Sequence, residues 1–287
     1  MPRCAFLSTD NLEDFFVYDD LVKPFLRRLG WAVEDVSWKN KYVDYNQYEL
    51  VVVRSTWDYQ QSPDAFLACL ERIHFSKASL ENSLALMRWN LSKAYLKDLA
   101  QENVQILDTL WYSSYRSQDI QAAFRHFQAQ QLIIKPLVSA NADDTFLFTL
   151  PELSVLDEAL QHLFKNRPFM VQAFEASILK DGEYSLFYFS GQFSHAIRKM
   201  PASGDFRVQE EHGGQLESLS PSKAMFELAE KTLQAMPADA LYARIDMLNT
   251  KMGMAIIEVE LIEPSLYFNM DIESAKRFAQ AIHQKYA

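Results

Sequence analysis

The stretch most informative about the fold is residues 241–267, LYARIDMLNTKMGMAIIEVELIEPSLY. Residues 242–248 alternate strand-like side chains, and residues 254–262 are rich in isoleucine and valine. The residues between them, 249–253, end in the glycine that a tight turn favours. The pattern therefore predicts two neighbouring strands joined by a short turn.

Three carboxylates interrupt these otherwise apolar strands. Asp246 lies in the first strand, and Glu258 and Glu260 lie two residues apart in the second. Because residues two apart on a strand point to the same face, two carboxylates share one side and the third is available from the neighbouring strand. Buried carboxylates repel each other unless a cation or a proton intervenes, and oxygen ligands suit Mg²⁺ that also binds phosphates. We expect an Mg-nucleotide site here; the alternative is the solvated face of a half-exposed sheet.

Composition limits the class of protein. The 287 residues are 49% hydrophobic, which indicates a globular chain with room for two or three subdomains. No run approaches the ~18 apolar residues of a membrane span, and the start, MPRCAFLSTDNLED, has no apolar signal core. The two cysteines, Cys4 and Cys69, lack metal-site spacing, so we expect a cytoplasmic protein. A net charge of -10 argues against broad nucleic-acid binding but leaves room for a nucleotide pocket, and we expect no membrane partner.

The first 60 residues read as a small parallel α/β layer, with strands predicted at 3–8, 31–36 and 48–53 and a helix at 17–29. Ligands of open α/β sheets bind beyond the carboxyl ends of strands. Arg54 and Asp58, just after the third strand, are therefore candidates for holding a substrate carboxylate or amine. The alternative is an Arg–Asp pair that holds the loop. No glycine fingerprint follows the first strand, which argues against a dinucleotide site.

Two lysines stand out in the middle of the chain. Lys93 lies in a helix predicted over 84–99, where a solvated lysine is the ordinary interpretation. Lys135 ends the apolar strand predicted at 132–136, and a lysine there is costly to bury unless it meets an anion. A change of composition near 77–82 marks a domain boundary. A hairpin predicted over 183–199 ends in a basic pair, and a looser, glycine-rich segment follows it.

Together these segments resemble the ATP-grasp superfamily. The resemblance is carried by VVVRSTWDY, RWNLSKAYL, IIKPLVSANADDT, GEYSLFYFSGQFSHAIRK, GDFRVQEEHGG, YARID and EVELIEPSL. It is strongest to the glutathione-synthetase-like branch that holds the O-ureido-serine cyclo-ligase of cycloserine biosynthesis. The implied fold is α/β (α+β), with a parallel N-terminal domain at 1–81, a small ATP-grasp subdomain at 82–174 and a C-terminal subdomain at 175–287.

The resemblance also implies a function and a set of site residues. It implies an ATP-dependent carboxylate–amine or cyclising ligase that acts through an acylphosphate on a small amino-acid-like substrate. It implies ATP with two Mg²⁺ ions, or Mn²⁺ in their place, and it allows a homodimer. The implied residues are Lys93, Lys135, Gln172, Ala173, Phe174 and Glu183 for the nucleotide; Asp246, Glu258 and Glu260 for the metal; Arg207 with Lys199 for the transferring phosphate; and Arg54, Ser55, Asp58 and Ser265 for the substrate.

Two departures from the family pattern matter. Glu260 stands where most of the superfamily has asparagine, and the loop after Lys135 lacks glycine, so closure of that loop would rely on Asn141 and its small neighbours at 139, 140 and 142. Two other functions stay open: a nucleotide-binding protein without ligase activity, and another phosphoryl-transfer enzyme. We expect His195, inside a strand, to be structural, whereas His212 is a candidate for contact with substrate.

Overall fold

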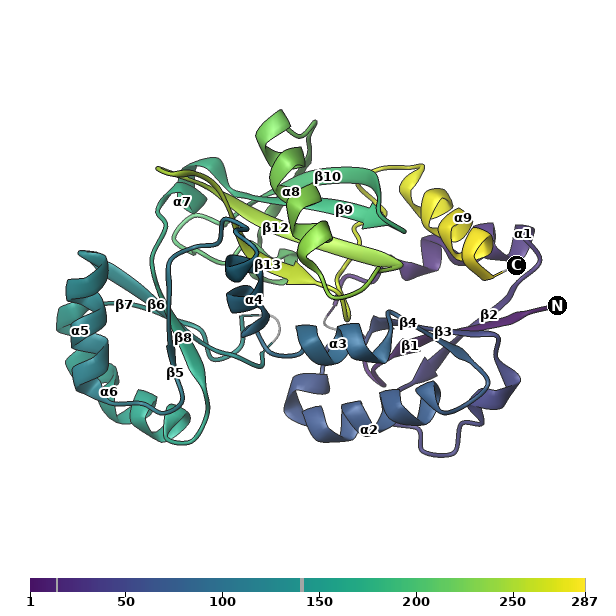
Figure 1. Ribbon diagram of the computed structural model, residues 1–287, viewed down its shortest axis with the longest axis horizontal. Coiled ribbons are helices and arrows are strands. Elements are labelled where there is room, and N and C mark those ends of the chain that lie inside the picture. Colours follow the sequence, from purple (N-terminus) through teal and green to yellow (C-terminus); the bar gives the residue numbers. More distant parts are fainter. Residues whose placement is uncertain (14, 140–141, 287) are drawn as a thin grey trace.

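The computed structural model describes residues 1–13, 15–139 and 142–286, and within them the strands form three sheets (Figure 1). Ala140 and Asn141, which we expected to help close the loop after Lys135, lie outside the described residues. The mixed α/β architecture expected from the sequence is confirmed. No helix in these ranges is long and apolar enough to cross a membrane.

The N-terminal part forms a parallel sheet in the order β2-β1-β3-β4. Its elements are β1 (Arg3–Ser8), α1 (Lys23–Arg28), β2 (Ala32–Ser37), β3 (Leu50–Ser55), α2 (Pro63–His74) and β4 (Ser79–Glu81). All six residues of β3 are buried, as expected for a central strand that is covered on both faces. The helix predicted over 17–29 is shorter, because a 3₁₀ turn precedes it and Pro24 occupies the first turn of α1.

The helix predicted over 84–99 is wrong, since two helices replace it: α3 (Leu84–Asn90) and α4 (Tyr95–Gln101). Lys93 lies in the break between them, where its amide donates to the carbonyl of Leu137 at 2.7 Å. The backbone thus bonds to the loop after β6 instead of continuing a helix. The break turns Lys93 away from solvent, and its side chain is buried.

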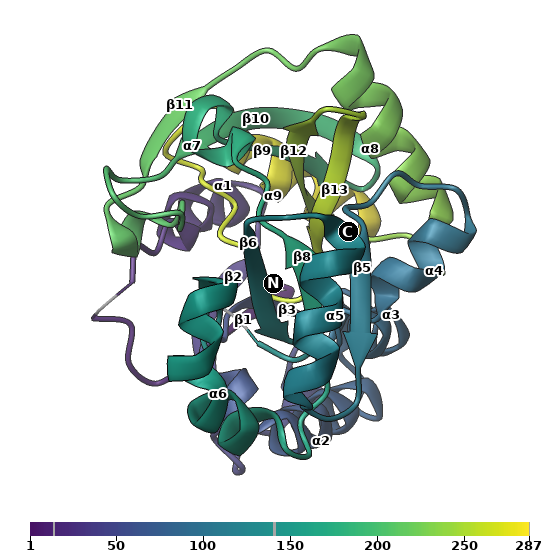
Figure 2. The ribbon, with the colours of Figure 1, turned by 90° about the vertical axis from the view of Figure 1, so that its left-hand side faces the viewer.

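The middle part is a small antiparallel sheet in the order β5-β8-β6-β7, with two helices packed along one side (Figure 2). Its elements are β5 (Thr109–Tyr112), α5 (Ser117–Phe127), β6 (Gln131–Pro136), β7 (Phe146–Thr149), α6 (Leu150–Phe164) and β8 (Phe169–Ala173). In β6, Leu132 and Ile134 face the helices in the core, whereas Lys135 points to the other face. The alternation of the strand therefore aims this lysine toward the third sheet.

The C-terminal part is an antiparallel sheet of five strands in the order β11-β10-β9-β12-β13. Its elements are α7 (Ser177–Asp181), β9 (Glu183–Phe189), β10 (Gln192–Met200), β11 (Gln215–Ser218), α8 (Lys223–Ala235), β12 (Tyr242–Thr250), β13 (Gly253–Glu260) and α9 (Ser274–Tyr286). The two strands predicted in the opening stretch are confirmed as β12 and β13, and the predicted 183–199 hairpin as β9 and β10.

The core joins the first and third sheets. One buried cluster contains Phe6 and Leu26 from the N-terminal part together with Phe187, Tyr242 and Phe278 from the C-terminal part. The N-terminal sheet is therefore packed against the C-terminal one rather than standing alone. The division of the chain after residues 81 and 174 stays a prediction.

Candidate active site

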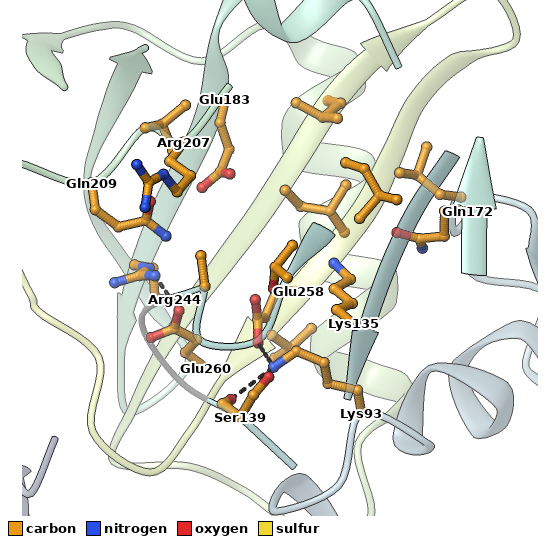
Figure 3. A pocket seen from close by; sticks show the side chains of 18 of the residues that line it. Lys93, Lys135, Ser139, Gln172, Glu183, Arg207, Gln209, Arg244, Glu258 and Glu260 are labelled. Atoms are coloured by element: carbon orange, nitrogen blue, oxygen red, sulfur yellow. Dashed lines mark hydrogen bonds and ion pairs between the residues drawn. The ribbon is translucent and has the colours of Figure 1, made fainter. Parts of the chain in front are cut away.

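A pocket lies between the small middle sheet and the C-terminal sheet, and side chains from both enter it (Figure 3). β6 and β8 form one wall, β9 and β13 form the other, and the edges are lined by Ser139, Ala142, Thr145, residues 206–209 and Glu211. Of the predicted site residues, the pocket is lined by Lys93, Lys135, Gln172, Ala173, Phe174, Glu183, Arg207, Glu258, Glu260 and Ser265. The fold thus brings together residues up to 172 positions apart.

Strand register fixes the carboxylates. Asp246 on β12 is paired directly with Glu258 on β13, and Arg244 is paired with Glu260. Glu258 and Glu260 both line the pocket, so the prediction that they share one face is confirmed. Asp246 is only 2% exposed, whereas the Glu258 and Glu260 side chains are 28% and 26% exposed. The two glutamates can therefore be reached by a ligand in the pocket.

The buried side chains of Asn90 and Tyr95 hold the end of β13 in this register. The Asn90 side chain donates to the carbonyl of Val259 at 2.7 Å and accepts from the amide of Leu261 at 3.0 Å. The Tyr95 hydroxyl accepts from the amide of Val259 at 2.7 Å. Since Val259 lies between the two glutamates, helices α3 and α4 fix the direction in which both carboxylates point.

Each carboxylate of the set is held by a cation. Lys93 Nζ lies 2.7 Å from Glu258 and donates to the carbonyl of Ser139 at 3.0 Å (Figure 3). Arg244 donates to Asp246 at 2.9 Å and also to Glu260. These cations partly neutralise the three like charges.

A second cluster lies deeper in the sheet. Lys199 contacts Glu183 and lies 3.5 Å from Asp246, which also accepts from the Ser185 hydroxyl at 2.5 Å. Lys199 is 3% exposed and is absent from the pocket lining. Lys199 is therefore placed to neutralise the buried carboxylates Glu183 and Asp246, and it is less well placed to contact a transferring phosphate.

The pKa values follow from this pattern. Burial would raise the pKa of Glu258, but Lys93 and Lys135 outweigh burial and lower it. Burial raises the pKa of Glu260 to about 7, and repulsion from Glu258 and Asp246 adds to the rise while Arg244 opposes it. Of the three carboxylates Asp246, Glu258 and Glu260, Glu260 is thus the one whose charge the protein neutralises least, and a divalent cation would relieve that charge.

The chemistry of Asp246, Glu258 and Glu260 suits a hard divalent cation. The donors are all carboxylate oxygens, which Mg²⁺ prefers, and they lie on adjacent positions of two paired strands. Within the described residues no three carboxylate, histidine or cysteine side chains already converge on one point. The carboxylates are turned instead toward Lys93, Arg244 and Lys199. The metal assignment of Asp246, Glu258 and Glu260 stays a prediction.

Lys135 differs from Lys93 in having no ion pair among the described residues. Burial lowers the pKa of its ammonium group, and repulsion from Lys93 adds to burial, while Glu258 and Glu183 only partly oppose the shift. Figure 3 shows it between Glu258 and Gln172, pointing into the pocket. A buried ammonium group without a close partner is suited to receive an anion.

Gln172, Ala173 and Phe174 lie where β8 leaves the small sheet. Gln172 donates to the Thr109 hydroxyl at 2.9 Å, and the amide of Phe174 donates to the carbonyl of Gln131 at 3.0 Å. All three residues line the pocket, so they are placed for the adenine contact that we expected of them, which stays a prediction.

Arg207 is held from behind by Asp205. The Asp205 carboxylate accepts from Arg207 Nη2 at 2.8 Å and from the backbone amides of Phe206 and Arg207 at 2.7 and 2.9 Å. These bonds hold the pKa of Asp205 below its usual range. Arg207 Nη1 lies 3.5 Å from His212 Nε2, and Arg207 lines the pocket. Arg207 is therefore a fixed cation at the edge of the site.

None of the substrate residues predicted in the N-terminal part lines the pocket. Arg54 is 1% exposed, bonds to Asp19 at 2.9 Å and lines no part of the pocket, and Ser55 bonds to the same carboxylate. Arg54 is thus part of a structural Arg–Asp pair, which was the alternative to a substrate contact. Its partner is Asp19, whereas we had expected Asp58. Burial of β3 explains the difference, because both side chains point into the protein instead of past the strand end.

Three other predicted residues have clear positions. Asp58 lines a neighbouring cavity, and Ser265 lines the pocket itself. His195 is buried, stacks on Phe187 with ring centroids 4.2 Å apart and has Nε2 3.0 Å from the carbonyl of Leu266. Burial lowers its pKa to about 4. The expectation that His195 is structural is confirmed.

Sequence reasoning missed Arg244, Glu263 and Asn90. Arg244 lies two residues before Asp246, so the same strand alternation places it on the carboxylate face and could have revealed it. Glu263 lines the pocket, and burial raises its pKa to about 8. Nothing in the local sequence distinguishes Asn90, whose partners lie 169 and 171 residues away.

Comparisons with known families agree with this geometry. Residues 105–276 match the family described as prokaryotic glutathione synthetase, ATP-grasp domain. Residues 4–82 match the family described as D-cycloserine synthetase DcsG, N-terminal domain.

Individual proteins are similar along nearly the whole chain. The cycloserine biosynthesis protein DcsG of Streptomyces lavendulae is 29% identical over 280 residues, which is 90% of each chain. The crystal structure of D-cycloserine synthetase DcsG superposes with a TM-score of 0.86 at 24% identity, over 99% of this chain and 100% of that chain. D-alanine–D-alanine ligase from Bacillus anthracis gives a TM-score of 0.63 at 11% identity, over 98% of this chain and 99% of the other. These structures share the fold.

Proposed function

The chain belongs to the prokaryotic glutathione synthetase ATP-grasp family, which makes it an ATP-dependent ligase, and we propose that it activates a carboxylate as an acylphosphate and joins it to an amine. One observation carries the proposal: Lys93, Lys135 and Arg207 converge on the pocket that also holds Glu258 and Glu260. Cations and carboxylates placed together are what a nucleotide triphosphate with a divalent metal requires.

We assign the nucleotide to the wall formed by β6 and β8. In this proposal Lys135 and Lys93 bind phosphate oxygens, the backbone at 172–174 contacts adenine, and Glu183 contacts the ribose hydroxyls. Lys135 suits this role because its charge has no close partner in the part of the chain that the structure describes. ATP-grasp enzymes use divalent metal ions, and Asp246, Glu258 and Glu260 would hold two Mg²⁺ or Mn²⁺ ions here. When bound, such ions supply positive charge to the phosphate oxygens.

The reaction then needs positioning and charge more than a nucleophilic side chain. A substrate carboxylate oxygen attacks the γ-phosphorus of ATP, the bond to the bridging oxygen breaks, and ADP leaves. An amine next attacks the carbonyl carbon of the acylphosphate, phosphate leaves, and the amine loses a proton. Arg207, held by Asp205, stabilises the charge that develops on the transferred phosphoryl group.

The acceptor side is where the substrate is chosen. The chain is similar to a cycloserine biosynthesis protein, and we extend this to a small amino-acid-like substrate for the present chain. Joining two molecules and closing a ring within one molecule are both compatible with the proposed chemistry. Ser265 and Asp58 remain the proposed substrate contacts, and a homodimer is the proposed assembly, which light scattering of the purified chain will test.

The test is ADP and phosphate release from Mg-ATP against a panel of amino acids, dipeptides and O-ureido-serine, with products identified by mass spectrometry. Release that depends on one acid and one amine, with a product lighter than their sum by one water, supports intermolecular ligation. Loss of water or ammonia from a single substrate supports ring closure. ATP binding with no release for any compound favours the alternative of a nucleotide-binding protein.

A further inference from the structure

The segment that carries Arg207, residues 205–214, is bonded within itself at the edge of the pocket, and we call it the Arg207 loop. The backbone amides of His212 and Gly214 both donate to the carbonyl of Gln209 at 3.0 Å. The carboxylate clamp described above holds the guanidinium group of Arg207 to the same loop. These bonds tie the loop into one unit, so a contact that fixes any part of the loop also fixes Arg207.

A hydrogen bond joins this loop to the N-terminal part of the chain. The Tyr18 hydroxyl donates to the Glu210 carboxylate, and both carboxylate oxygens lie 3.1 Å from it. Burial and the Glu210 carboxylate raise the pKa of Tyr18, so the hydroxyl keeps the proton that it donates. Within the described part of the chain, no other hydrogen bond or ion pair connects the Arg207 loop to residues 1–81. The attachment of the loop on this side therefore depends on Tyr18 and Glu210.

Tyr18 stands on a rigid base. The next residue, Asp19, accepts from Arg54 Nε at 2.9 Å and from the Ser55 hydroxyl at 2.6 Å. Because Arg54 and Asp19 are only 1% and 6% exposed, this charge-assisted pair is shielded from solvent and fixes the backbone beside Tyr18. The Tyr18 ring also packs against the ring of Tyr267, with centroids 6.1 Å apart. The strand end that we had expected to bind substrate thus anchors the residue that holds the Arg207 loop.

The Tyr18–Glu210 bond lies where the two segments border the pocket. On the loop, Gln209 and Glu211 flank Glu210 in sequence, and both line the pocket. On the N-terminal side, Phe15 lines the pocket three residues before Tyr18. Figure 3 shows the labelled side chains of the loop across the pocket from the lysine of β6. The bond therefore closes one side of the pocket, next to the guanidinium group that faces into it.

We propose that the Tyr18–Glu210 hydrogen bond positions Arg207 for phosphoryl transfer, so that Tyr18 and Glu210 are positioning residues of the reaction. This inference rests on the proposed function, in which Arg207 stabilises the charge that develops on the transferred phosphoryl group. A cation held in place beforehand stabilises that charge without the cost of rearranging at the moment of reaction. Neither Tyr18 nor Glu210 lines the pocket, so both act through the Arg207 loop and not on the substrate. The bond should therefore contribute to kcat and little to the binding of ATP or acceptor.

The kinetic test uses Tyr18→Phe, which removes the hydroxyl and keeps the ring. We expect kcat for ADP release to fall on the order of 10-fold, with the KM values for ATP and acceptor within about twofold of wild type. Glu210→Leu should have the same effect, whereas Glu210→Gln keeps an oxygen acceptor and should retain most of the activity. In an Arg207→Ala background, Tyr18→Phe should change kcat by less than about twofold, because the group that the bond positions is absent.

Tryptic cleavage after Arg207 reports on the same contact without the reaction. Arg207 is the only lysine or arginine within residues 200–222, so its cleavage products are identified by mass. In the protein without ligands, Tyr18→Phe should raise the initial rate of this cleavage about 3- to 10-fold. Tyr115→Phe is the matched control, because the Tyr115 hydroxyl donates to another carboxylate, Asp157, at 2.7 Å and Tyr115 does not line the pocket. The control should change neither the cleavage rate nor kcat.

Equal cleavage rates for Tyr18→Phe and wild type would overturn the proposal, because the bond would then not hold the loop. Faster cleavage with an unchanged kcat, or an equal fall in kcat with and without Arg207, would also overturn it. Absence of ADP release from the wild-type protein with every compound of the panel would instead overturn the proposed ligase function and, with it, the catalytic role of the bond. The cleavage rates would still show whether the bond holds the loop, which separates the two failures.

Discussion

The two lysines of the pocket should respond in opposite ways to the same substitution. Lys135→Met should stabilise the protein without nucleotide, because burial lowers the pKa of an ammonium group that has no close partner among the described residues. Lys93→Met should destabilise it, because Glu258 would lose the ammonium group 2.7 Å away that balances its charge. Both variants should bind ATP more weakly, since both lysines are assigned to phosphate oxygens.

The magnitudes follow from these surroundings. Replacing a poorly paired buried charge by an apolar side chain of similar length contributes about 1–2 kcal/mol, or a Tm increase of roughly 2–8 °C for a chain of this size. Breaking the Lys93–Glu258 pair should cost about 1–3 kcal/mol, below the cost for a fully buried pair, because Glu258 is 28% exposed and solvent screens its charge. Loss of one charge-assisted bond to phosphate should raise the ATP Kd roughly 10- to 100-fold in either variant.

The assay has two parts. Urea unfolding without nucleotide and Mg²⁺ gives the free energy of unfolding, and calorimetric titration with Mg-ATP gives the Kd. Lys223→Met is the matched control, because the Lys223 side chain is 89% exposed and does not line the pocket, and it should change neither quantity by much. The reasoning is refuted if Lys135→Met destabilises the protein as much as Lys93→Met does, or if Lys135→Met leaves the ATP Kd unchanged.

Three further predictions concern the acidic edge of the pocket. Glu258→Gln should lower ADP release at least ~100-fold with an unchanged circular dichroism spectrum, and full activity would contradict the metal assignment. Asn90→Ala should cost about 1–3 kcal/mol in urea unfolding, because it leaves the amide of Leu261 buried and unpaired, and a cost below 0.5 kcal/mol would show that water replaces the bond. Since the folded-state pKa of Glu263 is raised from 4.5 to about 8, its stabilising contribution is full below pH 4.5 and is lost as the pH rises to 8. Glu263→Gln should therefore reduce the fall in Tm between pH 5 and 9, and a fall as steep as that of wild type would contradict the raised pKa.

The local sequence pattern was sufficient to predict structure where a residue's neighbours in sequence are also its neighbours in space. The alternation of residues 242–262 predicted both strands and the shared face of Glu258 and Glu260, and strand pairing then placed Asp246 opposite Glu258. The same reasoning applied to Lys135, because its position at the end of an apolar strand fixes the side to which it points. These features depend on backbone geometry that repeats every two residues.

The rest depends on contacts that periodicity does not encode. Arg54 has the pattern of a ligand-binding residue, yet its partner is Asp19, 35 positions earlier, on a 3₁₀ turn that no pattern indicated. Lys93 lies in a helix break because its amide bonds to the carbonyl of Leu137, 44 residues later. In both cases tertiary hydrogen bonds decided the outcome, and helix or strand propensity is too weak to oppose them.

The internal ion pairs also bear on how ATP and metal would bind under the proposed function. Glu258 is held by Lys93, and Glu260 by Arg244, so a metal must compete with these cations for the carboxylates. A triphosphate offers Lys93 a second anionic partner. Each bond that Lys93 forms to phosphate weakens its pair with Glu258, and the Glu258 carboxylate can then bind the metal. ATP and Mg²⁺ should therefore each strengthen the binding of the other, as linkage requires of two ligands that share one set of partners. The Lys93–Glu258 and Arg244–Glu260 pairs thus offset the repulsion between the like charges of β12 and β13.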